Sequence, residues 1–162
     1  MYAQKQSDAE MEYKVKAGFV FNFLKFVSWP NDSVSESESW EIGIIAADGI
    51  VDLMREALAG KSVNGRPVRV FEFDPEDKEQ SCHVLFICRN LTKESADFTE
   101  LLREEPVLIV GESQDFARIH GIIGFVKKQQ NLRLEINPAR AKEAELIISG
   151  KLASLAELVE DK

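Results

Sequence analysis

Cysteine is scarce in this sequence: only Cys82 and Cys88 occur among its 162 residues. The residues between them, HVLFI, are mostly apolar, which is typical of a buried strand. Six residues of strand would separate the two Cα atoms by roughly 20 Å. A disulfide requires a Cα separation of about 4.4–6.8 Å. We therefore predict that the chain has no intramolecular disulfide and that both thiols are small buried hydrophobes.

Long apolar runs and an excess of basic charge are also missing. No run approaches the roughly 20 apolar residues that a helix needs to span a bilayer, so direct membrane insertion is not expected. The 20 Lys and Arg residues are outnumbered by 28 Asp and Glu residues, which gives a formal net charge of −8. Such a chain has no nonspecific attraction to nucleic acid or to anionic lipid. We therefore predict no nucleic-acid partner.

Motifs for catalysis or cofactor binding are lacking as well. The chain has neither a G-x-G-x-x-G fingerprint nor a Walker sequence for a nucleotide. Its two histidines, His83 and His120, have no second metal ligand at a suitable spacing and are interpreted as structural. The segment GESQD departs from the G-x-S-x-G elbow of hydrolases because Asp115 replaces the second glycine. We predict no catalytic residue, metal or cofactor, and a hydrolase that uses Ser113 is the last of the alternatives.

The stretch GFVFNFLKFVSWP has phenylalanines at both strand-like and helical spacings. A helix over Glu12–Ser28 separates its residues better, because one broad arc is then apolar and the opposite arc is polar. Lys16 and Phe21 violate this division, and Lys16 lies near the expected frayed start of the helix. The Trp-Pro pair ends the helix, since the residue before proline disfavours the α conformation. Phe21 is therefore predicted to be exposed, next to Asn22 and Lys25.

The later apolar patterns alternate between strands and helices. Strands are predicted at 40–47, 68–73, 83–87, 107–110, 122–128 and 132–137, and helices at 50–58, 92–104, 138–145 and 150–160. The connection QQN between the last two strands has hairpin length. This order predicts an α/β fold, a single-domain helix–sheet–helix sandwich with a mostly parallel sheet and an antiparallel C-terminal hairpin. The domain is expected at 13–160, after a flexible N-terminus at 1–12.

The segment LRLEIN is polar on one side. Leucine and isoleucine side chains alternate with Arg133, Glu135 and Asn137, which face the other way in a strand. A strand covered by helices on both faces should be apolar on both faces. The polar side therefore indicates either an exposed edge strand, with Arg133 and Glu135 as a surface ion pair of little energetic value, or the wall of a polar pocket.

The N-terminal residues MYAQKQSDAE contain neither the basic region nor the apolar region of a signal peptide. The letters YAQ nevertheless suit the end of a cleaved leader, with Ala3 just before the cut and Met1 added for expression. Residues 1–12 would then be the remnant after leader cleavage. An untouched cytoplasmic N-terminus is the other interpretation.

Several stretches together resemble the YfiR family of bacterial periplasmic proteins. They are KAGFVFNFLKFVSWP (16–30), GKSVNGRPVRV (60–70), CHVLFI (82–87) and the long segment 106–156. The positions that match the family motifs are Asn22, Phe23, Lys25, Phe26, Trp29, Pro30, Phe116, Ala117, Gly121, Phe125, Arg133, Glu135, Ile136, Asn137 and Ser149. The sequence departs from the pattern at His120, where a glycine pair is usual, and at Gly124, where a larger polar residue is common.

The resemblance implies regulation and no catalysis. Family members are exported to the periplasm, so the leader would be absent from this chain. The implied partner is an inner-membrane protein with a periplasmic sensing region, such as a diguanylate cyclase whose repression lowers cyclic di-GMP and biofilm formation. A homodimer is also expected, partly from the resemblance and partly from an exposed Phe21. The alternative function is a periplasmic small-ligand-binding sensor or transport-accessory module with a pocket near Arg133.

Two groups of residues are candidates for the partner or ligand surface. The first is Phe21, Asn22 and Lys25 on the opening helix. The second is Arg133, Glu135 and Asn137, with Phe116, Arg118 and His120 in a nearby loop. Hydrogen bonds that hold the 116–124 loop are an equally good explanation of the second group.

Overall fold

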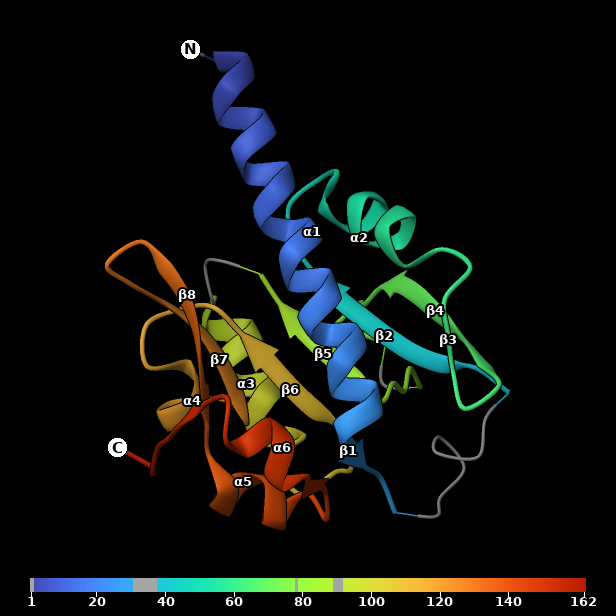
Figure 1. Cartoon of the computed structure of the whole chain (residues 1–162). Coiled ribbons are helices and arrows are strands. Elements are labelled where there is room, and N and C mark those ends of the chain that lie inside the picture. The colour runs from blue at the N-terminus through green and yellow to red at the C-terminus, as the bar shows by residue number, and fades with distance from the viewer. Residues whose placement is uncertain (1, 31–37, 78, 89–91) are drawn as a thin grey trace.

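The computed structural model describes residues 2–30, 38–77, 79–88 and 92–162, with side chains from Asp8 onward (Figure 1). Within these residues the helices are α1 Tyr2–Phe26, α2 Ile50–Leu58, α3 Lys93–Leu101, α4 Phe116–Ile119, α5 Pro138–Glu143 and α6 Gly150–Ala153. The strands are β1 Val27–Ser28, β2 Trp40–Ile45, β3 Ser62–Val63, β4 Arg66–Glu72, β5 Val84–Ile87, β6 Leu108–Gly111, β7 Ile123–Lys128, β8 Asn131–Ile136, β9 Ile147–Ile148 and β10 Glu157–Leu158.

The main sheet has the strand order β10-β8-β7-β6-β5-β2-β4-β3. Its central strands pair in parallel, from β4 through β2, β5 and β6 to β7. β7 and β8 then form an antiparallel hairpin. The two residues of its turn, Gln129 and Gln130, both have positive φ (53° and 68°), as the tight turns that match strand twist require. The predicted α/β fold with a C-terminal hairpin is confirmed.

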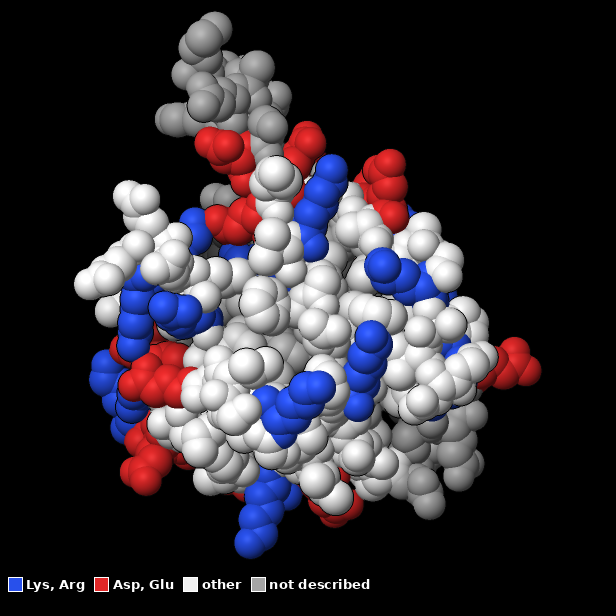
Figure 2. Space-filling view, viewed as in Figure 1, with Lys and Arg blue, Asp and Glu red and all other residues white. Residues whose placement is uncertain are grey.

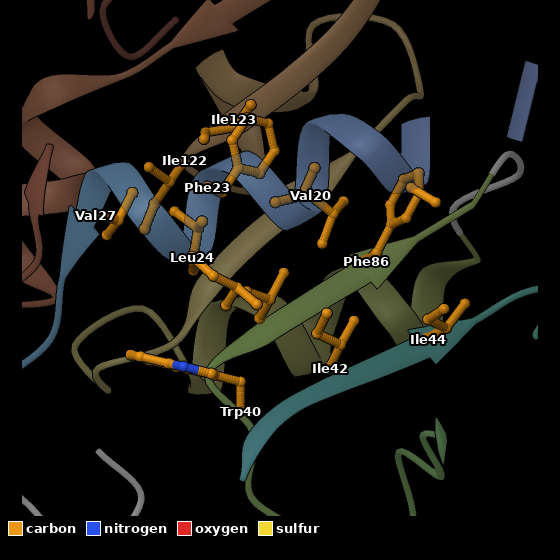
Figure 3. Close-up of a cluster of buried hydrophobic side chains, with 14 of the residues drawn as sticks. Val20, Phe23, Leu24, Val27, Trp40, Ile42, Ile44, Phe86, Ile122 and Ile123 are labelled. Carbon is orange, nitrogen blue, oxygen red and sulfur yellow. The ribbon is translucent and has the colours of Figure 1, made fainter. Parts of the chain in front are cut away.

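The long helix α1 crosses one face of the sheet and supplies much of its core (Figure 1). Its buried side chains recur every three or four residues, which places them on one stripe of the helix; they are Tyr13, Lys16, Ala17, Val20, Phe23 and Leu24. Figure 3 shows Val20 and Leu24 pointing toward the strands β2 and β5. These strands meet them with fully buried residues such as Ile42 and Phe86.

The opposite face of the sheet is covered by α3 and α4 (Figure 1). A second apolar cluster lies there, formed by Phe73, Cys82, Leu85, Ile87, Val107, Ile109 and Phe116, with Phe98 of α3 packed against it. The Oγ1 atom of Thr92 accepts a hydrogen bond from the backbone N–H of Ser95 (3.0 Å) and caps α3, because this N–H has no partner inside the helix. Helices therefore cover both faces, as the sequence predicts.

The boundaries and the buried stripe of α1 differ from the prediction. The helix begins at Tyr2, and it ends at Phe26 because Val27 and Ser28 pair as β1 with β9. Lys16 is buried and Phe21 is half-buried, so the predictions of a frayed lysine and an exposed phenylalanine are wrong. Met1 and the side chains of residues 2–7, which are part of the predicted leader remnant at 1–12, lie outside the description. Among the described helices, α1 included, none is both long and apolar enough to cross a bilayer.

The predicted C-terminal helix at 150–160 is wrong beyond its first turn. Helix α6 ends at Ala153, and the chain then pairs in parallel with β8 as β10. The backbone N–H of Val159 donates to the carbonyl of Ile136 (2.8 Å), which satisfies the edge of β8. An unpaired strand edge leaves a row of backbone donors and acceptors open. The end of β8, at Glu135 and Ile136, is therefore no exposed edge.

Candidate functional site

The predicted surface residues on α1 lie over a half-buried aromatic ring. The amino group of Lys25 lies 4.7 Å from the ring centroid of Phe21, and that of Lys61 lies 5.3 Å from the same centroid. Lys61 lies in the segment that joins α2 to β3. Helix α2 packs beside α1. Cations at these distances are attracted by the negative face of the ring. Asn22, the third predicted residue, is exposed next to this arrangement.

A second lysine–aromatic contact lies five residues further along α1, where the 100° rotation per residue turns the side chain toward the other flank of the helix. The amino group of Lys151, on α6, lies 5.3 Å from the ring centroid of Phe26. We call Phe21, Lys25, Phe26, Lys61 and Lys151 the lysine–aromatic face. Figure 2 shows this side of the molecule as a wide uncharged surface with basic side chains on it, while acidic side chains gather toward its margins. The sequence predicts only Phe21 and Lys25 as members of this face. Lys61 and Lys151 come from distant parts of the chain, and Phe26 was a motif position that was not among the candidate surface residues.

A polar cleft of about 440 Å³ opens at the carboxyl end of β6. It is lined by Glu12, Lys16, Glu112, Ser113, Gln114, Phe125, Val126, Lys127 and Leu132. The amino group of Lys16 donates to a carboxylate oxygen of Glu12 (2.8 Å) and to one of Glu112 (2.5 Å). The hydroxyl of Tyr13 donates to the other oxygen of Glu112 (2.6 Å). This buried cluster ties α1 to the end of β6.

Opposite charges are balanced inside this cluster. Lys127 forms a second ion pair with Glu12, so two carboxylates face two amino groups. Burial alone would raise the pKa of Glu12, but the hydrogen bonds and charges of Lys127 and Lys16 lower it below its usual value. Low solvent exposure strengthens such pairs because water screens them less. The side chain of Lys16 is only 4% exposed and that of Glu112 only 7%.

Sequence reasoning missed this cleft because it assigned Lys16 to a frayed helix start. A signal was nevertheless present, since Lys16 lies between Tyr13 and Val20 in the three- and four-residue spacing of the buried stripe. The hydroxyl of Ser113 is buried in the cleft wall and has no hydrogen-bond partner among the described residues. No histidine of the described chain lines the cleft, so the lining offers Ser113 no imidazole base.

The second predicted group does not form one polar site. Arg133 is exposed on β8, whereas Glu135 is 8% exposed and Asn137 is fully buried. The amide of Asn137 donates to the carbonyl of Ala117 (2.9 Å) and to a carboxylate oxygen of Asp161 (2.7 Å). Its oxygen accepts from the backbone N–H of Arg140 (3.2 Å) and so caps α5. The structural explanation of Asn137, holding the 116–124 loop, is therefore confirmed.

The predicted loop residues are anchored from the C-terminus. Phe116 is buried, while Arg118 and His120 are half-buried. The guanidinium of Arg140 donates to the carbonyl of Ile119 (2.9 Å) and to Asp161 (2.8 Å). Burial, together with the charge of Arg140, lowers the pKa of His120 below its usual value, so the imidazole is neutral at pH 7. The role of Arg118 and His120 in partner binding stays a prediction.

Asn137→Ala is expected to lower the free energy of unfolding by about 2–3 kcal/mol, because it removes a helix cap and leaves buried polar groups unpaired. Urea unfolding monitored by circular dichroism measures this change. Arg133→Ala, on the exposed part of β8, is the matched control and should stay within about 0.5 kcal/mol of the wild type. Equal effects of the two substitutions would contradict the structural role of Asn137.

Both cysteines are buried. Burial raises the pKa of the Cys82 thiol to about 12. The reactive form of a cysteine is the thiolate, so Cys82 is inert at neutral pH. The prediction that both thiols are small buried hydrophobes is confirmed.

The chain was compared with models of protein families. The family model described as YfiR/HmsC-like matches residues 13–157, which confirms the resemblance seen in the sequence motifs. A search of curated proteins found no match for the chain.

Proposed function

Because this chain belongs to the YfiR/HmsC-like family, we propose that it is a periplasmic, non-enzymatic regulator of an inner-membrane signalling protein. It binds the periplasmic region of that protein, a diguanylate cyclase, and lowers the output of cyclic di-GMP. The observation that carries the proposal is the extent of the family match, which runs from α1 to the start of β10.

Such a regulator acts by binding one state of its partner more tightly than another. A ligand shifts a two-state equilibrium only by the difference between its two affinities. The chain therefore needs a contact surface on a rigid support. The lysine–aromatic face supports the proposal, since α1 from Tyr13 onward is packed on the sheet and holds Phe21 and Phe26 in place. The proposal also includes a homodimer. Analytical ultracentrifugation measures the oligomeric state and so tests this part of the proposal.

Deletion of the gene is expected to raise cellular cyclic di-GMP and biofilm mass, because the cyclase loses its repressor. Quantification of the nucleotide by mass spectrometry measures the change. Exported protein should restore the low level, and the same chain retained in the cytoplasm should not. Intact protein used as bait on solubilised membranes should also co-purify the cyclase. An unchanged nucleotide level in the deletion strain would overturn the proposal.

Small-ligand sensing is a second candidate, and the cleft beside Glu112 favours it. Its lining combines apolar side chains, balanced charges and the buried hydroxyl of Ser113, which is the composition of many small-molecule sites. A ligand at this site should raise the melting temperature of the wild type but leave that of Ser113→Tyr unchanged, since the larger side chain fills the cleft.

A further inference from the structure

We propose that the lysine–aromatic face binds an acidic segment of another protein. This inference rests on the proposed regulatory function, and it adds where the partner binds and what chemistry its binding segment has. Three amino groups from three parts of the chain lie over the two rings: those of Lys25 and Lys61 over Phe21, and that of Lys151 over Phe26. All three lysines are exposed.

About half of the basic side chains that the structure describes have a carboxylate partner, and these three amino groups do not. Arg103 contacts Glu143 and Asp161, and other basic side chains have carboxylate partners too. Among the described residues, no carboxylate lies within ion-pairing distance of Lys25, Lys61 or Lys151, and their amino groups lie over aromatic rings instead. In a chain of net charge −8, a surface with three unneutralised lysines is complementary to an acidic partner.

The phenylalanine rings beneath the lysines provide apolar contact area beside the positive charge of the amino groups. Phe21 lies below two amino groups and Phe26 below one, and both rings are half-buried. Interfaces of specific complexes combine aromatic anchors with a polar rim. A partner segment that alternates acidic and apolar side chains would reach the amino groups and the ring edges together.

The distribution of charge favours a narrow segment over an anionic membrane surface. Acidic side chains gather toward the margins of this view of the molecule (Figure 2). At physiological ionic strength charges are screened beyond about 8 Å, so only local charges attract a ligand. A flat anionic membrane would extend over the acidic margins and be repelled there. A single protein segment can stay within the lysine–aromatic face.

Cross-linking in cells tests this inference. The full chain carries p-benzoyl-phenylalanine in place of exposed Asn22, and illumination joins position 22 to whatever lies against it. We expect an adduct with the inner-membrane protein that co-purifies with the wild type, through a peptide rich in Asp and Glu. An adduct with phospholipid, with a second copy of this chain or with a segment that has no acidic excess would overturn the inference.

Two double variants distinguish the effect of the lysines on the lysine–aromatic face from the effect of the overall net charge. Lys25→Glu with Lys151→Glu should lower the adduct yield roughly tenfold, because two attractive contacts become repulsive. The control, Lys93→Glu with Lys142→Glu, changes the net charge equally but leaves the face intact, and its yield should stay within about twofold. Equal loss in both variants would overturn the inference.

If the cyclase co-purifies without an adduct at position 22, this inference fails and the proposed function stands. If nothing co-purifies, the proposed function itself fails.

Discussion

Lys16→Ala is expected to lower the free energy of unfolding by about 3–5 kcal/mol, the range found when one partner of a buried ion pair is removed. The amino group of Lys16 bridges Glu12 and Glu112. Without it, the hydrogen bond from Tyr13 is the only one left to the buried carboxylate of Glu112 among the described residues. The contact between α1 and the end of β6 should loosen in consequence. Urea unfolding measures the change, and the cleft should show faster amide exchange.

Two further variants make this prediction specific. Lys14→Ala removes an exposed lysine from the same helix and should change stability by less than about 0.5 kcal/mol. Lys16→Met combined with Glu112→Gln removes both charges, so it should recover much of the lost stability, because no uncompensated charge stays buried. A Lys16→Ala variant as stable as Lys14→Ala would show that the cluster contributes nothing to holding α1.

Phe116→Ala is expected to cost about 3–5 kcal/mol, as do other substitutions that remove a buried phenylalanine ring. The ring is 1% exposed and lies against two glycines. A Cβ atom added at Gly111 would lie 2.3–2.5 Å from three carbons of this ring, which is too close for any real contact. Gly111→Ala should therefore destabilise the protein by about 1–3 kcal/mol through overpacking.

The double variant tests whether these two effects share one cause. With the ring gone, the new methyl group at position 111 has space, so Gly111→Ala should cost little in the Phe116→Ala background. Residues in direct contact usually show such coupling, of about 0.5–3 kcal/mol. Urea unfolding of the wild type, both single variants and the double variant gives the coupling energy. If the two changes in the free energy of unfolding simply add, Gly111 and Phe116 are not in contact in solution.

Local patterns predicted most of the sheet. The apolar run around Phe86 is β5, and Thr92 caps α3 as predicted. The short connection QQN correctly predicted a hairpin, although its last residue, Asn131, already belongs to β8. These features depend on neighbours in the sequence, so the sequence carries them directly. The same local patterns predicted the wrong environment for Lys16, because a lysine in an apolar stripe is unfavourable unless it has a charged partner. That partner, Glu112, is distant in the sequence.

The C-terminus shows the same limit. Leu152, Leu155 and Val159 have helical spacing, yet only Leu152 lies in a helix and Leu155 is 66% exposed. A short helix is only marginally stable without packing. The chain after Ala153 instead forms the strand β10, which pairs with the backbone donors and acceptors at the edge of β8.

The sequence by itself determined the alternation of strands and helices, the two-sided α/β sandwich and the family motifs, because each depends on residues a few positions apart. Only the tertiary structure decided which charges meet. It brought Lys16 to Glu112, tied Asn137 to the 116–124 loop, and formed the lysine–aromatic face from three separate parts of the chain. Contacts between distant residues follow from how the elements pack on the sheet, and no local pattern encodes that packing.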